Sequence, residues 1–159
     1  MCKAKMMKVF ILILALMVEL SAADKTEVMG KWKAVSKSTN NGTLTIEKEY
    51  LHLNADRTFS IVLLVSVQKG DAFIRDLEIK GSGIWRVSDH TLVAVVNKME
   101  VPFAKEIYRI SQASLRNLAA NFKRRFEKEP IRILTIKSID KNNFITVNEA
   151  LKQTHYIRQ

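Results

Sequence analysis

The residues that could carry out acid–base or metal chemistry are scattered along this chain. Its three histidines, His52, His90 and His155, have no neighbour at the spacing of metal ligands. The one cysteine, Cys2, stands next to the first residue, which leaves the rest of the sequence without thiolate chemistry or cysteine zinc sites. The sequence therefore predicts no catalytic residue, no metal site, no cofactor and no enzyme activity.

Two carboxylates, Glu47 and Glu49, could lie on one face of a strand, as an acid–base pair would, because residues two apart point the same way in a strand. A lysine, Lys48, stands between them in the sequence. We therefore interpret the pair as part of a solvated strand edge.

The first 23 residues have the pattern of a secretory signal. Lys3, Lys5 and Lys8 form a basic start, Val9–Val18 is an uninterrupted apolar run, and Ser21-Ala22-Ala23 supplies the small residues that a signal peptidase needs. A run of ten apolar residues is short of the ~20 that span a bilayer. We expect cleavage after Ala23, a secreted or periplasmic protein, and no stable membrane insertion after processing.

Residues 24–159 have the length of a single domain, and none of them is a cysteine. Removing three lysines and one glutamate with the signal lowers the formal net charge only from +10 to +8. A strongly basic protein favours anionic partners. Of these, we expect an anionic glycolipid or polysaccharide and no nucleic acid. The alternative is that the positive charge only keeps the protein soluble and has no specific partner.

Apolar residues alternate with polar ones along most of this domain, and turn residues recur about every ten positions. This pattern is typical of an all-β fold. The Asn41-Gly42 pair favours a tight hairpin. The expected strands cover residues 32–36, 43–53, 58–68, 73–87, 92–96, 101–110 and 131–139, with a final segment, 144–158, that forms one bent strand or two. Gly81 and Gly83 fall on the apolar side of the fourth strand, where they allow a bend.

One segment breaks the alternation. Between Ser114 and Glu127, apolar residues fall at helical spacing, and Pro130 ends the pattern. We expect an amphipathic helix packed on the outside of the β structure, over Val62 and Leu64. A second interpretation is that Lys123, Arg124, Arg125 and Lys128, interleaved with Phe122 and Phe126, grip phosphates or anionic lipid. Because both phenylalanines share the face of Leu115, we expect them to be buried instead.

Three motifs, Gly30–Ser36 with its Gly-x-Trp, Leu51–Phe59 and Gly83–Val87, resemble small secreted lipocalin-like proteins of bacteria, in the calycin superfamily. The resemblance implies an antiparallel up-and-down barrel of about eight strands that holds a small apolar or amphiphilic molecule. Lipocalins carry their main helix after the last barrel strand, whereas here it precedes the final strands. The topology of the closing strands is therefore left open.

The turn between the second and third strands sets their register. If Asn54 pairs with Thr58, Leu53 faces Phe59 and Leu51 faces Ile61, so that all four share one side. Families with this hairpin usually have glycine where Arg57 stands. Arg57 is therefore expected either to adopt a positive φ, at some cost, or to mark a different turn.

The strand pattern and the resemblance together assign the candidate site. In lipocalin-type folds an arginine from late in the chain covers the indole of the Gly-x-Trp, and the best-placed candidate over Trp32 is Arg158, with Arg132 as the alternative. We expect the interior to bind a small, largely apolar ligand, without catalysis. The alternatives are a filled barrel and a surface interaction protein that uses its basic face on an anionic envelope or host component. The expected lining residues are Leu51, Leu53, Phe59, Ile61, Leu63, Leu77, Ile79 and Trp85, with Tyr108 and Tyr156 as polar contacts.

Overall fold

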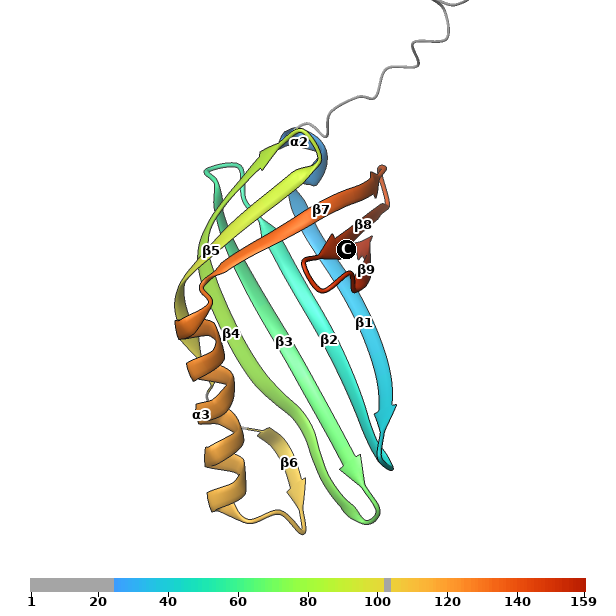
Figure 1. Cartoon of the computed structure of the whole chain (residues 1–159), viewed down its shortest axis with the longest axis vertical. Coiled ribbons are helices and arrows are strands. Elements are labelled where there is room, and N and C mark those ends of the chain that lie inside the picture. Colours follow the sequence, from blue (N-terminus) through green and yellow to red (C-terminus); the bar gives the residue numbers. More distant parts are fainter. Residues whose placement is uncertain (1–24, 102–103) are drawn as a thin grey trace, which may run out of the picture.

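The computed structural model describes residues 25–101 and 104–159, which form nine strands and two helices (Figure 1). The expected signal peptide and its cleavage site lie outside the described residues. The strands are β1 (Gly30–Asn40), β2 (Thr43–Leu53), β3 (Thr58–Lys69), β4 (Ala72–Ser88), β5 (Thr91–Glu100), β6 (Ala104–Tyr108), β7 (Ile131–Ile139), β8 (Asn143–Asn148) and β9 (Gln153–Arg158), and the helices are α2 (Lys25–Val28) and α3 (Gln112–Lys128).

Eight of these strands close an antiparallel barrel. The pairing runs β1-β2-β3-β4-β5-β7-β8-β9 and returns from β9 to β1. The expected all-β barrel of about eight strands is therefore confirmed, and the final segment is two strands. β6 lies outside the ring, where it pairs with the first part of β4 beyond the end of β5.

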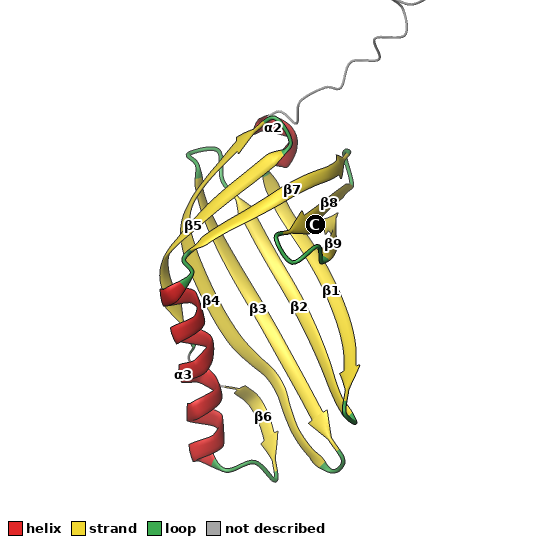
Figure 2. Cartoon of the chain, in the orientation of Figure 1, coloured by secondary structure: helices red, strands yellow, loops and turns green. Residues whose placement is uncertain are grey.

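The strands differ in length, and this difference shapes the molecule. β1 to β4 have 11 to 17 residues, whereas β8 and β9 have six each. The short strands close the ring only toward one end, and the long strands continue beyond them as a curved sheet (Figure 2). We call these two parts the closed section and the extension.

The hairpin turns follow the expected residues. Asn41 and Gly42 have φ values of 48° and 71°, as a two-residue turn between twisted strands requires. In the next turn, the Asn54 amide donates to the Thr58 carbonyl over 2.9 Å, and Arg57 has a φ of 68°. The resulting register places Leu53 opposite Phe59 and Leu51 opposite Ile61, as predicted.

The glycines of β4 permit a close approach between strands. A Cβ at Gly83 would overlap the carbonyl oxygen of Val95, and one at Gly81 would lie 2.9 Å from a methyl carbon of Ile61. The register between β4 and β5 also shifts at Gly83. These glycines therefore allow the bend that closes the wall.

Helix α3 packs outside the closed section, against the inner face of the extension. Its apolar residues Leu115, Leu118 and Phe122 join a buried cluster of Val65, Ile74, Leu77 and Ile79. The expectation that it covers Val62 and Leu64 was wrong, because these residues have the opposite parity to Val65 on β3. The short closing strands leave the inner face of β3 and β4 uncovered there, and the helix covers it (Figure 1).

Arg158 joins the last strand to the first. It pairs with Trp32 across β9 and β1, and its Cζ lies 4.0 Å from the centroid of the indole. Its guanidinium also donates to the carbonyl oxygens of Met29, over 2.8 Å, and Glu27, over 2.9 Å. The contact expected for Arg158 is therefore present, whereas Arg132, the alternative, lies over Phe126 at 4.5 Å.

Candidate functional site

The expected lining residues of the closed section are packed against one another. Leu51, Leu53, Phe59 and Trp85 are between 1% and 7% exposed and belong to one cluster with Trp32 and Phe144. The Trp85 indole donates to the Asn54 carbonyl over 3.2 Å. The end of the barrel near the Gly-x-Trp is therefore a filled core.

The remaining apolar candidates lie nearer the extension. Leu77 and Ile79 are only 1% and 2% exposed and belong to the cluster that α3 covers. Ile61 and Leu63 lie between the two cores, where each packs on one of them and keeps some accessible surface. Of the predicted apolar residues, these two have surface that a ligand could contact.

The prediction for Tyr108 was wrong. Its side chain is 49% exposed and stacks on Phe73, with 5.6 Å between the ring centroids. Tyr108 pairs with Phe73 across β6 and β4, and the Arg75 guanidinium lies over the Phe73 ring. Its neighbour Ile107 packs on the cluster under α3, so Tyr108, on the opposite face of β6, reaches the outer surface.

Tyr156, the other predicted polar contact, lies inside the barrel and meets a carboxylate there. It is 3% exposed, and its hydroxyl donates to Oε1 of Glu49 over 2.7 Å. Glu49 pairs with Ala34, which is part of the core, so its side chain points inward. The interpretation of Glu49 as part of a solvated edge was therefore wrong.

Glu47 also points inward, at the margin of the same site. It pairs with Ser36, whose hydroxyl donates to Oε2 over 3.1 Å, and the Lys152 ammonium lies 3.8 Å from the same oxygen. The parity of β2 could have revealed both glutamates, since Leu51 and Leu53 stand two and four positions after Glu49. Lys48, which stands between them and misled the interpretation, belongs to the other face.

Arg132 completes the site from the opposite wall. It pairs with Ala94, a residue that packs on the core, and its guanidinium covers the Phe126 ring. We call Glu49, Arg132 and Tyr156 the polar layer. It crosses the interior between the filled core and the cluster under α3.

Burial governs the ionisation of the polar layer. It raises the pKa of Glu49, while the hydrogen bond from Tyr156 and the positive charge of Arg132 oppose that rise. Burial and the nearby Glu49 carboxylate raise the pKa of Tyr156 well above its usual value. The layer can therefore offer a carboxyl group, a phenol and a guanidinium to a polar group that enters the barrel.

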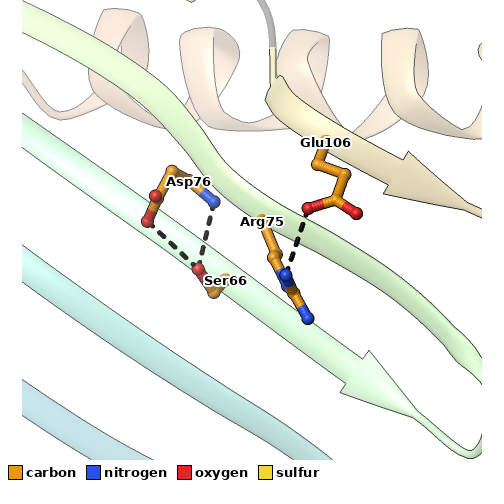
Figure 3. A network of polar contacts seen from close by, with 4 residues as sticks. All are labelled: Ser66, Arg75, Asp76 and Glu106. Atoms are coloured by element: carbon orange, nitrogen blue, oxygen red, sulfur yellow. Dashed lines mark hydrogen bonds and ion pairs between the residues drawn. The ribbon is translucent and has the colours of Figure 1, made fainter.

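A second feature lies on the outer face of β2, β3 and β4. A groove of about 230 Å³ is lined there by residues that include Lys48, Ser66 and Asp76. The Asp76 amide donates to the Ser66 hydroxyl over 3.0 Å, and Arg75 contacts Glu106 over 3.1 Å (Figure 3). These contacts join neighbouring strands at a β-bulge, so we assign them a structural role.

The aromatic residues of α3 contact the rest of the protein and do not form a surface site with its basic residues. Phe122 packs on the cluster under α3, and Phe126 lies under Arg132. Lys123 forms an ion pair with Glu127, 3.8 Å apart, one turn along the helix. Both phenylalanines are therefore only partly buried, and the expectation that they are buried is met in part.

No group of three or more His, Cys, Asp or Glu that could hold a metal ion occurs within residues 25–101 and 104–159. In the same part of the chain, no helix combines the length and apolar character needed to cross a membrane. No protein-family model and no curated protein matches this sequence. The residues themselves are therefore the basis for assigning a function.

Proposed function

We propose that this protein is an extracytoplasmic binding protein that holds a small apolar or amphiphilic ligand inside its barrel. The observation that carries the proposal is the polar layer, in which Glu49 and Tyr156 share a hydrogen bond near the charge of Arg132, inside a largely apolar interior. Burying ionisable groups costs free energy, and a barrel that needed only a stable core would be served by apolar residues there. Inward polar groups in an apolar pocket are typical of ligand sites.

Accessible surface in the middle of the barrel supports this site. Side chains of the filled core, such as Leu53 and Phe144, are at most 1% exposed, and Leu77 under α3 is equally buried. Between these levels Leu63, although it points inward, keeps accessible surface. The proposed ligand lays its apolar part along Ile61 and Leu63 and its polar group against the polar layer.

The proposed location follows from the amino-terminal sequence. A secretory signal that ends at Ala23 would deliver the protein to the periplasm or the exterior, where lipocalin-like proteins bind their ligands. An anionic glycolipid satisfies both the apolar interior and the net charge of +8 that remains after the signal is removed. The ligand class that we propose is therefore a small amphiphile.

The proposal is tested with the protein from its own compartment and with a probe. Native mass spectrometry is expected to detect a retained small molecule. A fluorescent fatty-acid probe is expected to bind with affinity of micromolar order and to be displaced by natural lipids. Leu63→Trp fills the space beside the polar layer and is expected to weaken probe binding about tenfold or more, while the fold survives.

Leu64→Trp is the matched control, because Leu64 is the next residue on β3 and faces outward. It is expected to leave probe binding unchanged. No saturable binding across a broad panel of apolar probes, together with no retained molecule, would overturn the proposal in favour of a filled barrel.

A further inference from the structure

β1 has a free backbone edge along its second half. On one side, β1 pairs with β2 over its whole length, from Gly30 to Asn40. On the other side it pairs with β9 only at Trp32 and Lys33. Within residues 25–101 and 104–159, no strand pairs with this side of β1 after Lys33, and the lower part of β1 forms the right-hand edge of the sheet in Figure 1.

Strand parity identifies the backbone groups that this edge exposes. The Lys31 carbonyl accepts from the Gln159 amide over 2.9 Å, so the odd residues of β1 direct their N–H and C=O away from β2. The even residue Asn40 flanks the two-residue turn and pairs with Thr43 of β2. Val35, Lys37 and Thr39 therefore each present an N–H and a C=O to solvent, which is the pattern that an added strand needs.

The side chains along the edge indicate the chemistry of a partner strand. Val35 is 59% exposed, and Lys37 and Thr39 are exposed beside it on the outer face. Lys31 and Lys33 share this face. A partner strand would place an apolar residue across from Val35 and an acidic residue across from Lys37, since opposite charges on facing residues stabilise a strand pair.

We propose that the free edge of β1, residues 35–39, accepts an extended acidic segment of a partner protein as an added antiparallel strand. A second copy of this chain fits poorly. The register that pairs Val35, Lys37 and Thr39 with a second copy places Lys37 opposite the Lys37 of that copy, and like charges that face each other are destabilising. Both copies would also be strongly basic.

The test uses a capped peptide, Thr-Thr-Glu-Thr-Val, which sets its glutamate across from Lys37 and its valine across from Val35 in antiparallel register. Binding to the purified protein is measured by amide chemical shifts and by hydrogen exchange. We expect saturable binding with protection of the Val35, Lys37 and Thr39 amides. N-methylation of the peptide's glutamate removes one donor, and we expect it to weaken binding about tenfold.

Variants of the protein separate backbone pairing from charge. Lys37→Pro removes the exposed N–H without touching the ladder to β2, so we expect a folded protein that binds at least tenfold more weakly. Lys37→Ala keeps the N–H and is expected to weaken binding only about threefold. Thr39→Pro repeats the backbone test if Lys37→Pro does not fold, as judged by circular dichroism.

Three results would overturn the inference. They are the absence of binding at millimolar peptide, equal affinity for the folded Lys37→Pro variant and the unchanged protein, and self-association through this edge in sedimentation. The experiment is independent of the proposed ligand, because the odd residues of β1 have the opposite parity to Ala34 and face away from the interior. Probe binding in the barrel is therefore expected to be unchanged in Lys37→Pro.

Discussion

Glu49 shows how burial of one ionisable residue couples stability to pH. Its carboxyl group lies beside Tyr156 and is influenced by the charge of Arg132. Burial is the largest influence on Glu49 and raises its pKa in the folded protein above the unfolded value of 4.5. The folded state therefore favours the protonated form. The stability that this preference contributes is present below pH 4.5 and is lost as pH rises through the folded pKa.

The variant Glu49→Gln is expected to remove this dependence. Relative to Glu49→Gln, the unchanged protein should lose free energy of unfolding as pH increases from 4.5 through the raised pKa. Urea unfolding of both proteins between pH 4 and 8 measures the difference, and other titrating groups cancel in it. Tyr156→Phe removes a hydrogen bond that lowers the pKa, so it should move the transition to higher pH. A difference that is constant with pH would contradict this account.

The same residues show what sequence patterns can and cannot predict about a site. Alternation along a strand predicted that Leu51, Leu53 and Tyr156 face inward, because side-chain direction depends only on parity. Glu49 obeys the same parity, but the run Glu47-Lys48-Glu49 resembles part of a surface strand. Only the fold shows that Arg132, from a strand far along the chain, lies close enough to offset its charge.

At the scale of elements, the pairing of β9 with β1 closes the barrel, although only two residue pairs form it. The Arg158 guanidinium supplements this short ladder with contacts to the Trp32 indole and to the carbonyls before β1. A cation over an aromatic face contributes about 0.5–2 kcal/mol. The two side chains therefore stabilise the closure as a unit.

A double-mutant cycle tests this closure. Trp32→Ala is expected to lower the free energy of unfolding by about 3–5 kcal/mol as a core truncation. Arg158→Ala is expected to lower it by about 1–3 kcal/mol, because the carbonyls of Met29 and Glu27 lose a charged donor. The double variant should lose less than the sum, since the residues are in contact. Strictly additive losses in urea unfolding would show that the contact does not couple them.

Most elements were predictable because their signals are local. The strands 43–53 and 131–139 have the expected limits, and the turns depend on neighbouring residues such as Asn41 and Gly42. The position of α3 depends on the lengths of distant strands, which no local pattern contains. β8 and β9 are too short to cover the inner face of β3 and β4, so the apolar face of the helix packs there instead of on Val62 and Leu64.

At the scale of the whole molecule, the closed section and the extension differ in how their backbones are supported. In the closed section each strand pairs on both sides and encloses a core in which Trp32, Trp85 and Phe144 are at most 1% exposed. In the extension, β1 pairs only with β2, and residues 37–40 are exposed on both faces. Local opening costs less free energy where few apolar contacts must be broken.

Amide hydrogen exchange is therefore expected to be slower in the closed section than in the extension. The slowest amides should belong to residues of the closed section such as Leu53 and Trp85, whose exchange requires global unfolding. Along the end of β1, protection should alternate, since Ser38 pairs with β2 whereas Lys37 and Thr39 donate to solvent. Exchange resolved by residue with NMR measures both effects. Equal protection of Lys37, Ser38 and Thr39 would mean that another segment covers the edge of β1, and the extension would then have to be regarded as part of the closed barrel.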